Sequence, residues 1–263
     1  MNTPIHFVRR YFCVVFALVF LQISESIASE VKAGASDRPA SRQAADSREK
    51  MEPWSERLFS QIGQEYGEDA VLRLRRVHDV AIANASRPVL EKLDIVNATI
   101  NSLAWVSDRE MWGKDDYWAT PMEIIAKAGG DCEDMAIAKF VMLRMMGVPA
   151  RNLYLGYARL KSQNMAHMIL VWANDARKEV RLLDNFDPQV RPPRERMDLQ
   201  IVYLNDVQGR VILIDDNGKT RRIKAELGER KMEKLEELKK RIQETRAKYI
   251  EYNDGRPPFP DRK

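Results

Sequence analysis

The strongest constraint on the fold is a single change of hydrophobic period along the chain. From Trp54 to about Trp105 apolar residues recur at helical spacing, and another helical pattern runs from Cys132 to Met146. After it, β-rich runs separated by polar turns begin with RNLYLGYARL and AHMILVWAN. Helices first and strands afterwards predict an α+β fold, in which a helical lobe precedes an antiparallel sheet.

Further signals divide these regions. Ser86–Arg87–Pro88 should separate two helices, because proline disfavours helix at the residue before it. The strand pattern continues through IVYLN and GRVILID, and the turn signal Asp216–Asn217–Gly218 follows. Residues 222–250 then predict a long charged helix with one apolar stripe. Such a helix packs back on the domain or binds a partner, and packing back is the commoner outcome.

The N-terminal region has the three parts of an export signal. Basic residues precede the apolar run YFCVVFALVFLQI, and Ser26–Ile27–Ala28 offers a cleavage site. The alternative is an uncleaved anchor, but the run is short for a bilayer span. We therefore expect a cleaved signal peptide over residues 1–28, export to the periplasm, and no stable membrane insertion afterwards. A flexible leader over 29–50, a folded domain over 51–252 and a disordered tail over 253–263 complete the prediction.

Charge and cysteine content narrow the chemistry. The chain carries 43 basic and 39 acidic residues, a net charge of +4, and 41 against 38 once the signal peptide is gone. The opposite charges are interleaved, so no nucleic-acid surface is predicted. Cys13 lies in the signal, which leaves Cys132 as the one cysteine of the mature chain. It cannot form an internal disulfide and is either a packed thiol or a reactive one.

Cys132 lies in GGDCEDMAIAKF, in the first turn of a predicted buried helix, with Asp131 as a plausible N-cap. Backbone N–H groups and the helix dipole at such an end favour a thiolate. The same N–H groups can hold the oxyanion that forms when sulfur attacks a carbonyl, with a second donor from the Tyr117–Trp118 loop. The position therefore suits a nucleophile.

A nucleophilic thiol also needs a base and a group that orients the base. His167 opens the strand AHMILVW, and Asp184, in LLDN on the next strand, could reach it across a hairpin. The other mature histidine, His78, lies on a predicted helical surface. Cys132, His167 and Asp184 are therefore a candidate triad. A core histidine beside an unrelated aspartate has the same spacing, and the spacing alone leaves both readings open.

Three acids flank the cysteine and would oppose its ionisation. Asp131, Glu133 and Asp134 could simply complement the helix dipole or cap the helix. Carboxylates so spaced also suit a hard cation such as Ca²⁺, with backbone carbonyls and water as further ligands. The local pattern allows both explanations.

DYWATP, GGDCEDMAIAK, AHMILVW and LLDN, in this order, resemble the bacterial transglutaminase-like cysteine proteinases over about residues 54–250. The resemblance implies a papain- or transglutaminase-like fold. It also implies Cys132 as nucleophile, His167 as base and Asp184 as its orienting partner.

The same resemblance implies a calcium site needed for activity. Its carboxylate ligands would be Asp131, Glu133 and Asp134. Backbone carbonyls of the RNLYLG strand would complete the site, and we expect these to be the carbonyls of Asn152 and Tyr154. By the same resemblance the protein is a periplasmic endopeptidase that cuts a large surface adhesin of the LapA type near its N-terminus. That cut releases the adhesin and disperses biofilm, and a membrane-bound c-di-GMP receptor of the LapD type sequesters the protease.

Two other functions fit the same residues. A transglutaminase or an amidase would use the same three side chains for a different acyl transfer. A non-catalytic, calcium-stabilised binding module would leave the cysteine inert and use the long C-terminal helix for a partner.

Overall fold

A computed structural model describes the chain over residues 53–174, 179–205, 211–214, 220–223 and 229–258. The predicted signal peptide, the leader and the turn at Asp216–Asn217–Gly218 lie outside these residues. Within the described part of the chain, no helix combines the length and the apolar character that a membrane span requires.

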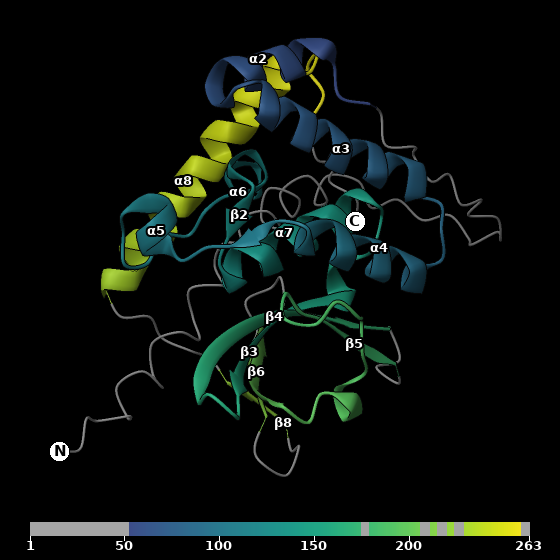
Figure 1. The fold of residues 1–263 in the computed structure, drawn as a ribbon, viewed down its shortest axis with the longest axis vertical. Helices are drawn as coiled ribbons and strands as arrows, with labels where there is room; N and C mark the ends of the chain where they lie inside the picture. The colour runs from purple at the N-terminus through teal and green to yellow at the C-terminus, as the bar shows by residue number, and fades with distance from the viewer. Residues whose placement is uncertain (1–52, 175–178, 206–210, 215–219, 224–228, 259–263) are drawn as a thin grey trace, which may run out of the picture.

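The helices form one lobe (Figure 1). Among them α2 (Glu56–Tyr66) packs on α3 (Glu68–Asn84), while α4 (Val89–Asn101) and α6 (Pro121–Lys127) pack on α7 (Cys132–Met145). The break between α3 and α4 falls at the predicted Pro88. The predicted start of the buried helix at the cysteine is confirmed as well.

The strands form a second layer against α7. Their order in the sheet is β5-β4-β3-β6-β7-β8, and every neighbouring pair is antiparallel. The strands are β3 (Leu153–Leu160), β4 (Met165–Ala173), β5 (Val180–Leu183), β6 (Leu199–Asn205), β7 (Val211–Ile214) and β8 (Thr220–Ile223).

α7 lies between the two layers. It contacts α4 and α6 on one side and β4 and β3 on the other, so most of its side chains are buried. Burial on all sides explains why its sequence is apolar around nearly the whole helix. Met168, Leu170 and Trp172 of β4 join the same core as the helices. The predicted α+β architecture, with helices before an antiparallel sheet, is confirmed.

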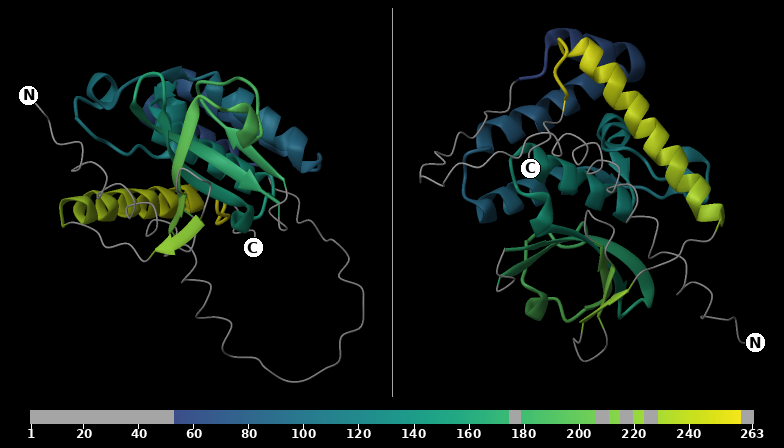
Figure 2. Two further views of the ribbon diagram at one scale, coloured as in Figure 1. Left: turned by 90° about the horizontal axis from the view of Figure 1, so that it is seen from below. Right: turned by 180° about the vertical axis from the view of Figure 1, so that it is seen from behind.

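The long C-terminal helix packs back on the domain, as predicted. α8 (Glu229–Tyr252) runs along the helical lobe and ends beside α2 (Figure 2). Its predicted start at residue 222 is wrong, because residues 220–223 form β8. Pairing with β7 aligns Val211 with Ile223, and this contact between separate segments overrides the local helical pattern.

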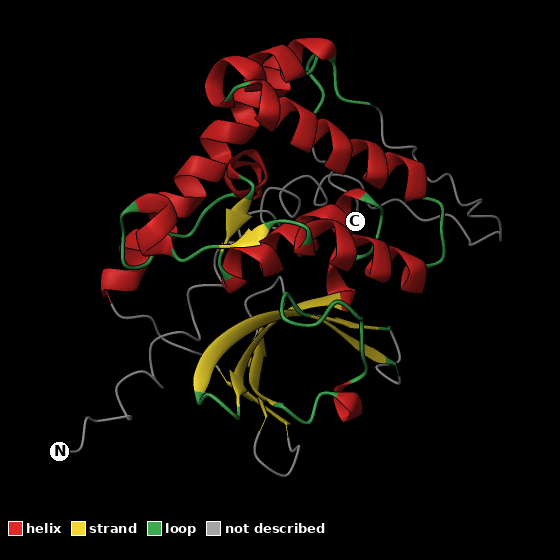
Figure 3. Ribbon diagram, viewed as in Figure 1, coloured by secondary structure: helices red, strands yellow, loops and turns green. Residues whose placement is uncertain are grey.

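Part of the predicted tail is packed. The indole Nε1 of Trp54 donates a hydrogen bond to the Pro258 carbonyl at 2.8 Å, and the backbone N–H of Ser55 donates to Oδ1 of Asn253 at 2.8 Å. Residues 253–258 therefore close against the start of the domain, and the packed chain continues at least to Pro258. Figure 3 shows the long helices gathered on one side and the antiparallel sheet on the other, with the two short strands β1 and β2 among the helices.

Candidate active site

A close approach of backbones sets the start of α7. β1 (Ala104–Trp105) pairs in parallel with β2 (Gly129–Gly130), immediately before the cysteine helix. A Cβ on Gly129 would lie 2.9 Å from the Ala104 carbonyl oxygen, and one on Gly130 would lie 2.9 Å from Oδ2 of Asp134. The two glycines therefore let the chain pass between β1 and the acidic first turn of α7.

Cys132 is the first residue of α7, and Asp131 is its N-cap by position. The Asp131 side chain makes no capping hydrogen bond, so helix capping does not explain this carboxylate. The Cys132 thiol donates to Oε2 of Glu133 at 3.1 Å. Burial raises the pKa of the thiol well above its usual range, the Glu133 and Asp131 charges raise it further, and a backbone hydrogen bond at Met168 lowers it. The thiol therefore needs the neighbouring negative charge compensated before it ionises near neutral pH.

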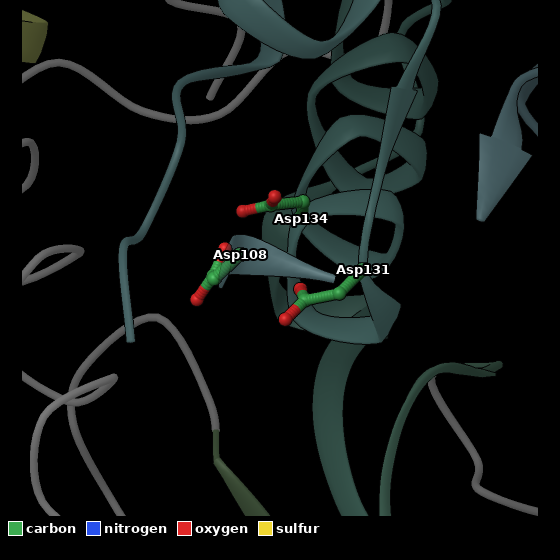
Figure 4. Close-up of side chains that lie close together, drawn as sticks. All are labelled: Asp108, Asp131 and Asp134. Carbon is green, nitrogen blue, oxygen red and sulfur yellow. The ribbon is translucent and has the colours of Figure 1, made fainter. Parts of the chain in front are cut away.

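Asp108, Asp131 and Asp134 point at one another (Figure 4). One carboxylate oxygen from each lies within 4.8 Å of the others. Oδ1 of Asp131 and Oδ2 of Asp134 are buried and have no hydrogen-bond partner in the described chain. Unsatisfied buried carboxylate oxygens that converge in this way are the ligands a hard cation such as Ca²⁺ takes, so the residues fit the predicted metal.

The raised pKa values of these acids also favour a bound cation. Burial, followed by the charges of Glu133, Asp134 and Asp108, raises the pKa of Asp131 to about 10. Burial and the Glu133 charge also raise the pKa of Asp134 well above its usual range. A bound cation would reverse this effect and keep the carboxylates ionised.

The predicted ligand set is only partly gathered in this group. Asp131 and Asp134 lie together, and Glu133 belongs to an overlapping group with Asp108 and Asp116. Sequence reasoning missed Asp108, a buried residue in the first turn of α5 (Asp108–Trp112). Its N-cap Ser107, with Glu110 three residues on, marks a helix start, but only the fold brings this helix beside α7.

The loop before α6 orients these acids. The Tyr117 backbone N–H donates to Oδ2 of Asp108, and the Ala119 N–H donates to Oδ1 of Asp134 at 2.9 Å. The Tyr117 N–H, one of the oxyanion donors considered from the sequence, is therefore directed at an acid instead. The loop holds two carboxylates whose remaining oxygens face the cluster.

Asn152 directly precedes β3, and Tyr154 is the second residue of that strand. Nδ2 of Asn152 donates to the Ala173 carbonyl at 2.8 Å, which ties the beginning of β3 to the end of β4. Tyr154 stands opposite Val171 in the β3–β4 ladder. Both are buried, and their carbonyls as metal ligands stay a prediction.

His167 and Asp184 meet as the predicted hairpin requires. Nε2 of His167 lies 2.7 Å from Oδ1 of Asp184, and both side chains are buried. Nδ1 of His167 is buried and has no hydrogen-bond partner among the described residues. Burial of Asp184 raises its pKa, but the His167 hydrogen bond and charge, the Phe186 N–H and Arg196 together lower the pKa to about 2. The carboxylate is therefore ionised and holds the imidazole.

The second histidine has a structural place. His78 is buried, rather than on the helical surface that its sequence pattern suggested, and its Nε2 accepts a hydrogen bond from the Trp54 backbone N–H at 3.0 Å. Its ring also packs against Trp54 and Phe59. It fastens the start of the domain to α3.

A cysteine at the start of a helix, packed against an antiparallel sheet that carries a histidine–aspartate pair, defines the transglutaminase-like class of thiol enzymes. The family model described as bacterial transglutaminase-like cysteine proteinase BTLCP matches residues 61–199, more than half of the chain. The chain belongs to this family of cysteine proteinases.

Solved structures agree with this assignment. The calcium-bound LapG of Legionella pneumophila is 29% identical with a TM-score of 0.56, over 68% of this chain and 96% of that one. The EGTA-treated LapG of the same organism is 28% identical with a TM-score of 0.58, over 73% of this chain and 100% of that one. No curated protein sequence matches the chain. The transglutaminase-like fold expected from the sequence is confirmed.

Proposed function

We propose that this protein is a calcium-dependent cysteine endopeptidase of the LapG type, with Cys132, His167 and Asp184 as its catalytic triad. The observation that carries the proposal is the 2.7 Å contact between Nε2 of His167 and Oδ1 of Asp184. It leaves the buried Nδ1 as the nitrogen able to accept a proton. Cys132 begins α7, and the backbone that hydrogen-bonds at its sulfur belongs to Met168, the neighbour of His167.

The proposed reaction uses these positions. The Cys132 sulfur attacks the carbonyl carbon of a peptide bond while Nδ1 of His167 takes the thiol proton. The backbone N–H of Cys132 lies in the first turn of α7, where no carbonyl of the helix precedes it, and stabilises the oxyanion. His167 then gives its proton to the departing amine, and the remaining thioester is hydrolysed by water that His167 activates. Asp184 keeps the proton on Nε2 and stabilises the imidazolium.

Asp108, Asp131 and Asp134 would hold the calcium ion, with Glu133 beside them and the carbonyls of Asn152 and Tyr154 as further ligands. The ion supplies positive charge that offsets the acids next to the thiol. The description of related LapG structures as calcium-bound and EGTA-treated supports this choice of metal. Fixed carboxylates would also hold the start of α7 in place.

We further propose export to the periplasm by the signal over residues 1–28, and a substrate of the LapA adhesin type cut near its N-terminus. Cleavage would release the adhesin and disperse biofilm, under the control of a LapD-type c-di-GMP receptor. The support for this part is the family membership and the similarity to LapG.

The test incubates the mature protein with the N-terminal fragment of a candidate adhesin, with calcium or with EGTA, and sequences the N-termini of the products. We expect a cut with calcium, none with EGTA, and none for Cys132→Ala under either condition. Cleavage by Cys132→Ala would overturn the proposal. Equal cleavage with calcium and with EGTA would remove the calcium requirement alone.

The same samples separate the rival functions. Mass spectrometry would show cross-links or deamidated glutamines if the enzyme is a transglutaminase or an amidase. A binding module would leave the fragment intact and Cys132 unreactive towards iodoacetamide at neutral pH.

A further inference from the structure

Asp184 has a second buried partner, Arg196. Nη1 of Arg196 lies 2.8 Å from Oδ2 of Asp184, and the two side chains are 6% and 0% exposed. The contact is a buried ion pair. We propose that Arg196 is a positioning residue for the catalytic histidine: it fixes the Asp184 carboxylate so that Oδ1 faces Nε2 of His167. This inference rests on the triad proposed above.

The guanidinium is held in place from the solvent side. Nε and Nη2 of Arg196 donate to the two carboxylate oxygens of Asp198 at 2.9 and 2.7 Å. Such a two-point contact sets the plane of the guanidinium, which a lysine ammonium cannot match. The remaining nitrogen, Nη1, is thereby presented to Asp184 in a fixed direction.

The two oxygens of Asp184 have separate tasks. Oδ1 lies against Nε2 of His167 and accepts the Phe186 N–H at 2.9 Å, while Oδ2 faces Arg196. The cation at Oδ2 keeps the carboxylate from turning and makes Oδ1 the oxygen that holds the ring. Loss of Arg196 would leave a buried charge uncompensated and the imidazole with a less firmly placed partner.

A second basic side chain, Lys139, acts on Asp184 but cannot take the role of Arg196. Lys139 of α7 is buried, and that burial lowers its pKa to about 7 although the Asp184 charge raises it. Its ammonium is therefore partly neutral at neutral pH, whereas a guanidinium stays charged. Among the described residues, His167 from β4, Lys139 from α7 and Arg196 from the segment before β6 act on Asp184. The negative charge of Asp198, on the far side of Arg196, also acts on it and opposes ionisation.

The placement of Arg196 sets it apart from its neighbours. Arg194, two residues earlier, is 84% exposed, and its ion pair among the described residues is a long one of 3.9 Å with Glu195. A buried ion pair is weak evidence for stability, because apolar side chains of the same volume serve the fold as well. The contact of Arg196 with Asp184, the aspartate that holds His167, favours an orienting role for Arg196 over a purely structural one.

The test reads His167 directly by nitrogen NMR on ¹⁵N-histidine-labelled mature protein, in a Cys132→Ala background that removes the thiolate. The mature chain has two histidines, His78 and His167, so two sets of ring signals are expected. In the parent, the neutral form of the His167 ring should carry its proton on Nε2. Arg196→Gln should give a mixture of the two tautomers. Arg196→Lys should restore part of the population with the proton on Nε2, and the exposed control Arg194→Gln should match the parent.

A second readout uses the protein with Cys132 intact. Arg196→Gln should slow alkylation of the thiol by iodoacetamide at neutral pH by about 10- to 100-fold, the loss that removal of an outer orienting partner causes at metal-bound histidines. Arg194→Gln should leave the rate unchanged. An unchanged or faster rate in Arg196→Gln, with the parent tautomer retained, overturns the role of Arg196 and leaves the triad standing.

Two results separate the linked proposals. A parent His167 without a proton on Nε2 would overturn the triad itself. If circular dichroism shows that Arg196→Gln does not fold, Asp198→Asn takes its place, because it alters a side chain that is 47% exposed and keeps both Arg196 and Asp184. In Asp198→Asn, a partial loss of the tautomer with the proton on Nε2 supports the proposal, even if it is smaller than the loss expected for Arg196→Gln. A spectrum identical to that of the parent overturns it.

Discussion

Nε2 of His167 lies 2.7 Å from Oδ1 of Asp184, at a point where both side chains are excluded from water. If this contact orients the base of a cysteine endopeptidase, Asp184→Ala should lower kcat by about 10²- to 10⁴-fold, the usual contribution of a positioned acid–base group. KM should change little, because Asp184 does not touch substrate in the proposed reaction. Steady-state cleavage of an adhesin fragment would measure both constants.

Asp198→Ala is not a suitable control for that experiment, since Asp198 holds Arg196. Asp115→Asn is suitable, because its exposed carboxylate pairs with Arg109 at the surface. It should keep the parental kcat. An Asp184→Ala variant with parental kcat would exclude Asp184 from the catalytic machinery.

The acidic cluster predicts which side chains bind calcium. Asp134→Asn should weaken calcium binding measured by isothermal titration calorimetry, and Asp108→Asn should weaken it as well, since both side chains point into the cluster (Figure 4). In EGTA, Asp134→Asn should unfold at a higher temperature than the parent, because burial and the Glu133 charge oppose ionisation of that carboxylate. Parental affinity in both variants would place the calcium site elsewhere.

The sequence predicted what local patterns determine. The strand period around His167 and the strand end at Asp184 indicated a hairpin, and Asp131 as an N-cap indicated a helix start at Cys132. The fold contains both. Asp108 escaped prediction because only the pairing of β1 with β2 brings α5 to the N-terminus of α7. Arg196 escaped it because RPPRERMD has the composition of an exposed loop. For both Asp108 and Arg196, the contact that decides their role joins separate segments of the chain, and the local sequence of neither segment predicts that contact.

A residue of the C-terminal helix supports the loop that orients the acids. Nη1 of Arg241 donates to the Tyr117 hydroxyl at 2.6 Å, and Nη2 donates to the Trp118 carbonyl at 2.7 Å. The guanidinium also lies 4.4 Å from the centre of the Tyr117 ring. Arg241→Met should therefore lower both the unfolding temperature and the calcium affinity, measured by differential scanning calorimetry and titration calorimetry.

The neighbouring Lys240 provides the matched control. Its side chain is 75% exposed, and in the described part of the chain it pairs with Glu244 one turn along the helix, a contact that contributes about 0.5 kcal/mol or less. Lys240→Met should leave both quantities near the parental values. Equal effects of the two substitutions would mean that Arg241 acts through general helix stability rather than through the loop.

The buried Lys139 gives a prediction about pH. Burial lowers its pKa from 10.5 in the unfolded chain to about 7 in the folded protein, against the opposing effect of Asp184. Between these values the unfolded chain binds the proton and the folded protein does not, so the free energy of unfolding should rise with pH, by at most about 1.4 kcal/mol per pH unit. Lys139→Met, of similar length and uncharged, should remove this rise and should be more stable than the parent below pH 7, where the parent carries a buried ammonium. Urea unfolding at a series of pH values measures the slope, and a parental slope in Lys139→Met would assign the pH dependence to another group.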